Sequence, residues 1–520
     1  MIRFTVEFYT SNSATLIIDD GGNFHTLNTY TLRLNGENKG EVSTTVYNLF
    51  DLDPSTEYKA ELLKDGNVVD TVSFATLSEP ISISVKEMGA KGDGVSDDTA
   101  FIQAAIMACP KGGRVYFPAG TYKTLPIFLK SDIYVEVCKG AVISAFTDRN
   151  RFPVLPAEKV SKDGNDSLYI SSWEGNPVPT WASIITGIDA ENVVLYGEGT
   201  VDGCASKADW WDRPKELKET FRPRMLFLAH CRNVKVQGLL FTNSPSWTLH
   251  PYFTDDFAIY GTRVSNPPDA PNTDGFDPES CNGLKVWGIH FSVGDDCIAV
   301  KSGKIYMGHK YKTPCENVDI SYCLMERGHG AVTLGSEIGA GVRNIRVNRC
   351  DFIDTDRGLR LKTRRGRGED SVIDDVIFSN IKMDGVKTPF VINSFYFCDP
   401  DGKTEYVQDR NPLPVDERTP YIKNVLFENC ECHNCHFAAS YLIGLPERKI
   451  ESVTFKNVHI DFAKEAEKGF AAMLCGLEET CKMGFSVTNV DRLTMENVTI
   501  EGQDGEPYLF ENVNKVSVNG

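Results

Sequence analysis

A short pattern recurs through most of this chain, and it constrains the fold more than any other feature of the sequence. In each copy a polar pair is followed by an apolar residue, then by a variable one and a second apolar one. Seven copies begin Glu191-Asn192-Val193, Arg232-Asn233-Val234, Asn282-Gly283-Leu284, Glu316-Asn317-Val318, Arg343-Asn344-Ile345, Lys423-Asn424-Val425 and Glu451-Ser452-Val453. Leu284, Val318 and Ile345 are 34 and 27 residues apart, with no long helical pattern between them. Repeats of this length made of short strands are typical of a solenoid of parallel strands.

We therefore expect an all-β architecture, a right-handed parallel β-helix over residues 79–520. A β-propeller would need about 40 residues per blade and a Trp-Asp signature, which the sequence lacks. Apolar residues at helical spacing predict one helix near 98–108, which would cap the open N-terminal edge of the solenoid. The preceding Asp97-Asp98 pair would satisfy free amides at the start of this helix rather than act as a catalytic pair.

Residues 1–78 predict a separate small β-sandwich. Short alternating strands, such as 30–34 and 68–74, are separated by Gly and Asn/Asp turns. The stretch 52–58 resembles the tyrosine corner of a fibronectin type III domain, in which the hydroxyl of Tyr58 would bind nearby backbone. We favour a spacer role for this module over a contact with carbohydrate, with a linker at 77–80.

The composition excludes several classes of partner. The chain has 54 Lys+Arg and 72 Asp+Glu, so its net charge is 54 − 72 = −18 at pH 7, which opposes binding to nucleic acid or to an anionic membrane. No run of about 18 apolar residues predicts a membrane-spanning helix, and residues 1–7 alternate like a strand rather than a signal peptide. Fifteen cysteines, an odd number, favour reduced thiols and a cytoplasmic location.

Four polar segments each lead into an apolar strand: 272–277, 294–300, 328–332 and 358–362. Because residues one coil apart in a parallel solenoid lie about 4.8 Å apart, side chains at matching positions gather on one surface. The chemically active residues that we expect to gather there are Asp274, Asp295, Asp296, His329, Arg360 and Lys362.

Arg360 and Lys362 suggest that an anion binds at this surface. Strand alternation turns Leu359 and Leu361 inward and leaves the two cations on the outer face, about 7 Å apart. Two neighbouring cations repel each other unless an anion lies between them. A substrate carboxylate would supply that anion, and the alternative is a pair of salt bridges to local acids.

The motifs Asn-Thr-Asp-Gly, Gly-Asp-Asp, Gly-His-Gly and Arg-x-Lys, in this order and at this spacing, resemble the polygalacturonases of glycoside hydrolase family 28. The resemblance covers about residues 83–520, and it includes Gly92-Asp93-Gly94 and the turn at 199–203. The sandwich in front resembles the layout of some bacterial exo-acting members. The resemblance implies inverting hydrolysis of α-1,4-galacturonosyl bonds in oligogalacturonides, without a metal or another cofactor.

The resemblance also implies roles for the acidic residues. Asp295 would be the general acid, and Asp274 with Asp296 would hold and deprotonate the water, with His329 hydrogen-bonded to the acid. An inverting enzyme needs its carboxylates about 6.5–9.5 Å apart to leave room for that water. Crowding of three carboxylates should raise at least one pKa, as a general acid requires.

A further set of residues is expected to bind the substrate. Arg360 and Lys362 would hold the uronate carboxylate, and Tyr396 matches a family tyrosine downstream of the basic pair. The segment 243–250 resembles one that borders the cleft. The full predicted substrate-binding set is Arg360, Lys362, Tyr396, His250, Trp247 and Asn272.

Two nearby motifs receive less specific interpretations. In the run 430–436, alternation places Cys430 and Cys432 on one strand face, which favours a solenoid core over a zinc site. We therefore predict no metal. The run 364–367, Arg-Arg-Gly-Arg, is expected to extend the uronate-binding end of the cleft rather than to bind nucleic acid.

Three other functions remain open. A rhamnogalacturonan or xylogalacturonan hydrolase would share the Asp trio, but a rhamnose subsite would not need Arg360 and Lys362 together. A pectate lyase would use the Asp cluster to bind Ca²⁺ and an Arg as the base. A non-catalytic β-helix adhesin would bind without turnover.

We expect exo action of the enzyme, because short oligomers, not polymers, reach a cytoplasm.

Overall fold

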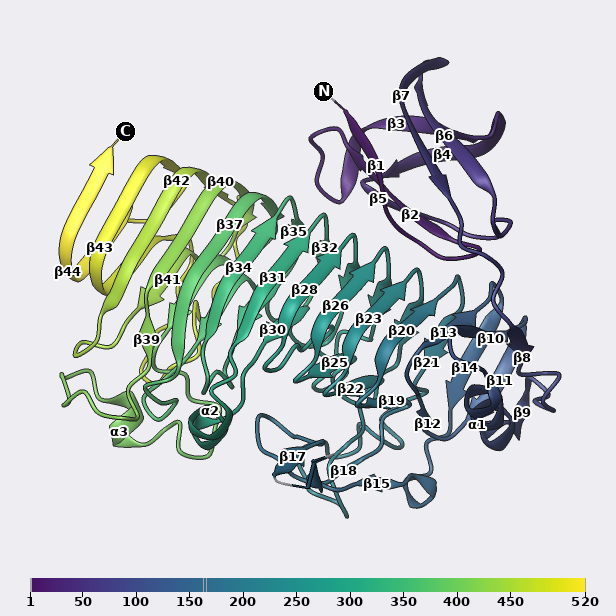
Figure 1. Ribbon diagram of the computed structural model, residues 1–520. Coiled ribbons are helices and arrows are strands. Elements are labelled where there is room, and N and C mark those ends of the chain that lie inside the picture. Colours follow the sequence, from purple (N-terminus) through teal and green to yellow (C-terminus); the bar gives the residue numbers. More distant parts are fainter. Residues whose placement is uncertain (1, 162, 165, 520) are drawn as a thin grey trace.

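The computed structural model describes residues 2–161, 163–164 and 166–519, and it consists of a small β-sandwich followed by a long parallel β-helix (Figure 1). The predicted right-handed β-helix is confirmed. Its coils lie one after another from β8 (Ser82–Ser84) at one end to β44 (Tyr508–Asn519) at the other. Among the described residues, no helix combines the length and the apolar character needed to span a membrane.

The recurring polar pair marks a tight turn before a strand. In five of the seven copies the second residue has a positive φ, such as 58° at Asn192, 52° at Asn233 and 56° at Asn317, whereas Asn424 and Ser452 lie within strands without it. The amides also bond from coil to coil, and Nδ2 of Asn233 donates to Oδ1 of Asn192 at 2.7 Å. Short polar side chains therefore serve both the turn and the stacking. The paired strands include β20 (Glu191–Tyr196), β23 (Arg232–Gln237), β26 (Asp255–Tyr260), β28 (Asn282–Trp287), β31 (Cys315–Ser321), β34 (Val342–Asn348) and β37 (Val372–Asp384).

A second ladder of apolar residues runs beneath the polar segments. Phe276 pairs with Ile298, Ile298 with Val332, Val332 with Leu359 and Leu359 with Phe390, and all five side chains are buried. Two residues that lie the same number of positions before or after their ladder residues are therefore neighbours on consecutive coils. The strands that carry it are β30 (Ile298–Val300), β33 (Val332–Leu334), β36 (Arg357–Lys362) and β38 (Thr388–Asn393).

The helix expected near the start of the solenoid is α1 (Thr99–Ala108), at the end of the β-helix opposite the C-terminus (Figure 1). It buries Ile102, Ala105 and Ile106 against the first coils. Asp97 accepts a hydrogen bond from the Thr99 amide at 3.0 Å, whereas buried Asp98 accepts from backbone amides of the preceding loop. Asp97 thus satisfies an amide at the start of the helix, as expected, whereas the Asp98 side chain makes no such cap and fixes the loop before the helix.

The N-terminal module has two antiparallel sheets. One contains β1 (Arg3–Tyr9), β2 (Ala14–Asp19) and β5 (Val46–Leu49). The other has the order β4-β3-β6-β7, from β4 (Glu37–Thr44), β3 (His25–Leu34), β6 (Glu57–Lys64) and β7 (Asn67–Ala75). The Tyr58 hydroxyl accepts a hydrogen bond from the Asp53 amide at 2.8 Å, the local contact of a tyrosine corner.

The sandwich lies along the side of the β-helix (Figure 1), and its spacer role stays a prediction. Glu7 pairs with Lys285 at 2.5 Å, and the amide of Asn23 donates to the Cys350 carbonyl at 3.1 Å. Phe50 fills the space over Gly238, where a Cβ would come within 2.4 Å of its ring. These contacts join the N-terminal module to several coils, so the module packs directly against the β-helix.

Replacing Tyr58 with Phe removes one largely buried hydrogen bond and keeps the ring. We expect Tyr58→Phe to lower the free energy of unfolding by about 1 kcal/mol in denaturant titrations. Tyr47→Phe is the matched control, because the Tyr47 hydroxyl makes no hydrogen bond with any described residue. Equal stability of the two variants would contradict a stabilising role for the Tyr58 contact.

Candidate active site

The three aspartates of the Asn-Thr-Asp-Gly and Gly-Asp-Asp motifs gather at one point on the β-helix. Asp274 and Asp296 each lie two residues before the apolar ladder, and therefore at matching positions on consecutive coils. One oxygen from each of Asp274, Asp295 and Asp296 lies within 4.8 Å of the other two. The register alone thus places together three carboxylates that are up to 22 residues apart in the sequence.

Asp296 lies between two cations. Arg360 Nη1 is 2.9 Å from its Oδ1, and Lys362 Nζ is 2.8 Å from its Oδ2. The Asp296 side chain is only 1% exposed, and burial alone would raise its pKa, but Lys362 and Arg360 together hold that pKa well below its usual range. We call these three residues the Asp296 triad. Of the two alternatives that the sequence left open, the structure shows a local acid between the cations.

The second glycine of the Gly-His-Gly motif gives Arg360 access to Asp296. Gly330 occupies the intervening coil at the position that matches Asp296. A Cβ at Gly330 would come within 2.8 Å of the Asp296 carboxylate and 2.4 Å of the Thr333 hydroxyl. A side chain there would separate the two charges, so the motif requires glycine at this position for packing reasons.

Asp295 and His329 also occupy matching positions, three residues before the ladder. His329 Nδ1 is 3.3 Å from Asp295 Oδ1, and this hydrogen bond raises the pKa of His329. Asp295 is 24% exposed and His329 is about half exposed, whereas Asp274 and Asp296 are buried. Asp295 is therefore the carboxyl of the trio that faces the open side of the site, and His329 is the imidazole hydrogen-bonded to it.

Crowding of the carboxylates predicts raised pKa values, and two buried residues, Asp274 and Asp277, have them. Burial, reinforced by neighbouring Asp295, raises the pKa of Asp274 well above its usual range. Burial raises the pKa of Asp277 to about 8, opposed by Lys301, whose Nζ lies 3.5 Å from Asp277 Oδ1. The site therefore combines protonated carboxyls with the ionised carboxylate of Asp296.

The carboxyl separation expected for an inverting pair stays a prediction. One oxygen from each member of the trio lies within 4.8 Å of the other two, whereas the spacing of about 6.5–9.5 Å refers to whole carboxyl groups. The close approach is possible because Arg360 and Lys362 neutralise one of the three carboxylates.

A buried charge row beneath the trio was missed by the sequence reasoning. Lys301 lies 3.3 Å from Glu337 and 3.5 Å from Asp277, and its Nζ is 4.4 Å from the centroid of the Trp247 ring. Strand alternation does indicate the direction of Lys301, because Ile298 and Val300 point inward and Lys301, the next residue, therefore points outward. Lys301 and Lys362 occupy the same register position two coils apart, with Gly335 between them.

Most of the predicted substrate-binding residues border one cavity of about 530 Å³ together with the aspartate trio. Tyr396 is among them, its ring centroid 5.4 Å from Lys362 Nζ, and so are Trp247 and Asn272. Trp247 is only 4% exposed, because Lys301 and Arg224 lie against its ring. Trp247 therefore forms part of the floor of the cavity rather than an open stacking face.

The predicted substrate contact of His250 is wrong. Its side chain is fully buried, with Nε2 3.1 Å from Glu279 Oε2 and its ring against the edge of Trp247. Burial lowers the pKa of His250 well below its usual range, so the ring is neutral. His250 supports the floor of the cavity from below.

The arginines of the 364–367 run do not extend the uronate-binding end. Arg364 and Arg367 pair with Asp399, and Arg365 pairs with Glu447 at 2.6 Å. All three guanidinium groups are buried. The Asp399 pairs, together with hydrogen bonds from Arg365 to the Tyr406 and Asp409 carbonyls, hold the long segment between β38 and β39 (Tyr421–Ile422), which brings Tyr396 to the cavity.

A second cavity, of about 680 Å³, continues from the first and shares Asn272 with it. Trp173 stacks on Phe221 with ring centroids 5.2 Å apart, and the Arg222 guanidinium lies over the Trp173 ring. Lys215 borders both cavities and forms no ion pair with any described residue. These residues come from irregular insertions between coils, at 146–184 and 203–225, where no repeat pattern points to them.

The donor set at the trio is a poor match to a hard cation. Ca²⁺ requires six to eight oxygen ligands, mostly carboxylate and carbonyl groups. Both oxygens of Asp296 already accept from Arg360 and Lys362, and Lys301 adds a third positive charge nearby. The arrangement suits acid–base chemistry on an anionic ligand better than Ca²⁺ binding.

Comparison with known proteins agrees with this geometry. The model of the glycosyl hydrolases family 28 matches residues 145–472, and a model described as rhamnogalacturonase A/epimerase, pectate lyase-like, matches residues 82–133. A probable polygalacturonase of Vitis vinifera is 28% identical over 78% of this chain and 79% of its own length. An endo-polygalacturonase of Pectobacterium carotovorum subsp. carotovorum is 29% identical over 68% of this chain and 85% of its own length.

Two solved structures share the architecture. A hyperthermoactive exopolygalacturonase from Thermotoga maritima superposes with a TM-score of 0.64 at 25% identity, covering 82% of this chain and 94% of that one. The family 28 exopolygalacturonase of Yersinia enterocolitica gives a TM-score of 0.72 at 18% identity, covering 100% and 99% of the two chains. The second likeness extends over the N-terminal module as well, and at this identity it shows the fold alone.

Removing one cation from the Asp296 triad should shift the acid limb of the activity profile. In Lys362→Met, the pKa of Asp296 rises because burial remains while one opposing charge is lost. Asp296 is then protonated at a higher pH than in the wild type. As the pH is lowered, kcat/KM on oligogalacturonides therefore begins to fall at a higher pH. Lys387→Met, which removes a partly exposed lysine paired with Asp356, is the control. An unshifted acid limb in Lys362→Met would contradict the role of the triad.

Proposed function

Because the chain belongs to family 28 of the glycosyl hydrolases, we propose that it hydrolyses α-1,4-galacturonosyl bonds of short oligogalacturonides and releases galacturonic acid from one end. The observation that carries this proposal is the Asp trio, with Asp296 held ionised, in a cavity bordered by Arg360 and Lys362. A net charge of −18 would repel a polyanionic substrate, so the local cations supply the attraction.

In the proposed reaction, Asp295 acts as the general acid and donates a proton to the glycosidic oxygen as the bond to the anomeric carbon breaks. A water between Asp274 and Asp296 attacks that carbon and gives its proton to Asp296, which is the ionised member of the trio. His329 then reprotonates Asp295 across their 3.3 Å contact. Proton exchange with solvent returns Asp296 to its ionised state and restores His329.

The substrate carboxylate is proposed to bind at the outer side of the Asp296 triad. Lys362 has three N–H donors and Arg360 has five, so each retains donors beyond the one that contacts Asp296. Tyr396 lies against Lys362 on the same side. In the adjoining cavity, Lys215 and Arg222 supply further positive charge for a second uronate, and Trp173 supplies an aromatic face.

Exo action is supported by the walls of the second cavity and by the 25% identical exopolygalacturonase structure. The insertions at 146–184 and 203–225 rise beside the cleft and carry the residues that border it. Trp210 packs these insertions together through Phe152 and Trp181. Endo action is the second candidate, favoured by the relative from Pectobacterium.

Two further assignments are part of the proposal. The 3+4 strand arrangement and the Tyr58 contact support a fibronectin type III-like identity for the N-terminal module. A cytoplasmic location is supported by the odd number of cysteines, fifteen.

The substrate and the direction of attack can be tested with trigalacturonate and longer oligomers in EDTA, with products identified by mass spectrometry. We expect saturated monomer and dimer from the trimer, and monomer from one end of each longer oligomer. Mixed internal products would favour the endo enzyme. An unsaturated product, or activity abolished by EDTA, would favour the lyase and contradict the hydrolase.

The roles of the trio can be tested with Asp295→Asn. We expect kcat to fall by at least about 10³-fold with product binding retained, because the amide cannot donate the proton. Asp375→Asn, on an exposed turn of the same β-helix, should keep full activity. Proton NMR of the first product should show the β-anomer if the reaction inverts. Retained activity in Asp295→Asn would contradict its role as the acid.

A further inference from the structure

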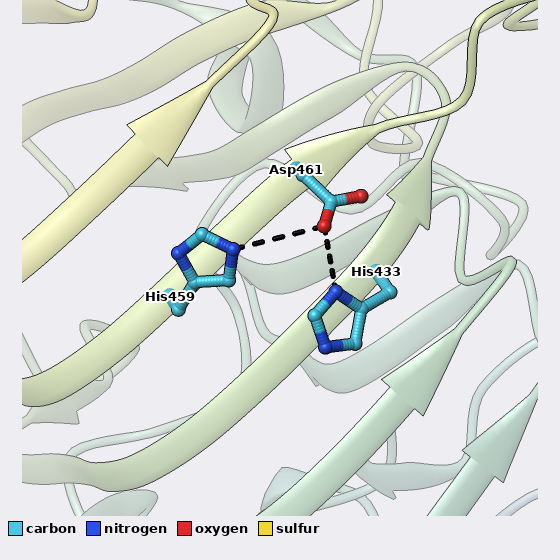
Figure 2. A group of neighbouring side chains, drawn as sticks. All are labelled: His433, His459 and Asp461. Carbon is cyan, nitrogen blue, oxygen red and sulfur yellow. Dashed lines mark hydrogen bonds and ion pairs between the residues drawn. The ribbon is translucent and has the colours of Figure 1, made fainter.

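A group of three side chains with metal-binding chemistry lies on the outer surface of the last coils (Figure 2). His433 belongs to β40 (Asn424–Cys435), and His459 and Asp461 belong to β42 (Ile450–Phe462). One ligand atom from each lies within 4.8 Å of the other two. Two imidazoles and a carboxylate are the donors of many three-ligand zinc sites, in which water takes the fourth position.

We propose that His433, His459 and Asp461 bind one Zn²⁺ ion, or a chemically similar divalent transition ion, on the surface of the β-helix. Figure 2 shows both rings directed at the same oxygen of Asp461. His433 Nδ1 is 2.6 Å from Oδ2, and His459 Nε2 is 3.7 Å from it. A tetrahedral ion with bonds of about 2.0–2.1 Å needs its ligand atoms about 3.3 Å apart, and the two distances lie on either side of that value.

The carboxylate and one ring are oriented by neighbouring groups. The Asn434 amide donates to Asp461 Oδ1 at 2.8 Å, which leaves Oδ2 for the two rings. His459 Nδ1 lies 2.8 Å from the Thr499 hydroxyl on β43 (Met483–Glu501). When that nitrogen carries the proton, the Nε2 lone pair faces Asp461, which is the tautomer that binds a metal.

The sheet register holds the group in place and surrounds it with negative charge. His459 pairs with Glu431 on one side and with Thr499 on the other. Asp384 pairs with His433, and Asp461 pairs with Glu501. Asp384, Glu431 and Glu501 are exposed acids on adjacent coils, so the local field favours a cation. The ligands lie on paired strands, which limits the movement needed for binding.

The ligand set differs from the one that the Cys/His run suggests in the sequence. Cys430, Cys432 and Cys435 are buried in the solenoid core and do not reach the group. His433 lies on the outward face of the same strand, and its partners come from the next coil. The core interpretation of the cysteines and a metal site on the outer face are therefore compatible.

Isothermal titration of the EDTA-treated full chain with ZnCl₂ tests the proposal. We expect one saturable site per chain and a rise in Tm with Zn²⁺. His459→Asn should weaken binding by more than about 100-fold, and Thr499→Val, which removes only the orienting contact, by about 10–100-fold. Co²⁺ should give the visible absorption of a four-coordinate ion in the wild type and not in His459→Asn.

His309→Asn is the matched control, because His309 is also a half-exposed histidine paired with one acid, Asp370, at 2.9 Å, but it lacks a second ring. It should bind Zn²⁺ like the wild type, and so should Asp295→Asn in the active site. Equal affinity in His459→Asn and the wild type would overturn the proposal, as would absence of a saturable site. Circular dichroism of each variant checks that these surface changes leave the fold intact.

Discussion

Stacking of buried apolar residues from coil to coil is the constraint on which this structure depends. The ladder from Phe276 through Ile298 and Val332 to Leu359 fixes which residues are neighbours on adjacent coils, and a slip of one residue would turn buried side chains outward. The residues of the candidate active site lie at fixed numbers of positions before or after the ladder residues in the sequence. Asp274 and Asp296 therefore lie together because the buried ladder, and backbone hydrogen bonds such as that from the Gly275 amide to the Asp296 carbonyl at 3.0 Å, hold their coils in register.

Close packing of carboxylates is costly, and the structure offsets that cost with cations at neighbouring register positions. Lys362 and Arg360 hold the pKa of Asp296 low, and Lys301 lies beside Asp277, whose pKa burial raises to about 8. Glycine at 330 leaves the space through which Arg360 reaches Asp296, whereas a Cβ at Gly335 would meet the backbone of Lys362. The result is an ionised carboxylate at Asp296 beside Asp274 and Asp277, whose pKa values burial raises.

The sequence predicted the β-helix, the helix at its start and the gathering of the aspartates, because each depends on local periodicity. It missed the coils that begin at Asp255 and Asp374, where Asp replaces Asn in the turn. It misplaced His250, because a strand pattern does not reveal what covers a residue from above. The residues of irregular insertions, such as Trp173, and the lateral packing of the sandwich depend on long-range contacts, for which no repeat gives a signal.

The central claim is that Asp296 stays ionised between Arg360 and Lys362. The direct measurement is infrared titration of protein labelled with ¹³C-carboxyl aspartate, taking the difference between the wild type and Asp296→Asn. The carboxylate band assigned to Asp296 should persist to pH values well below the ordinary aspartate pKa of about 3.9, for as long as the protein stays folded. A carboxylate band that titrates at or above that value would contradict the claim and remove Asp296 from the role of base.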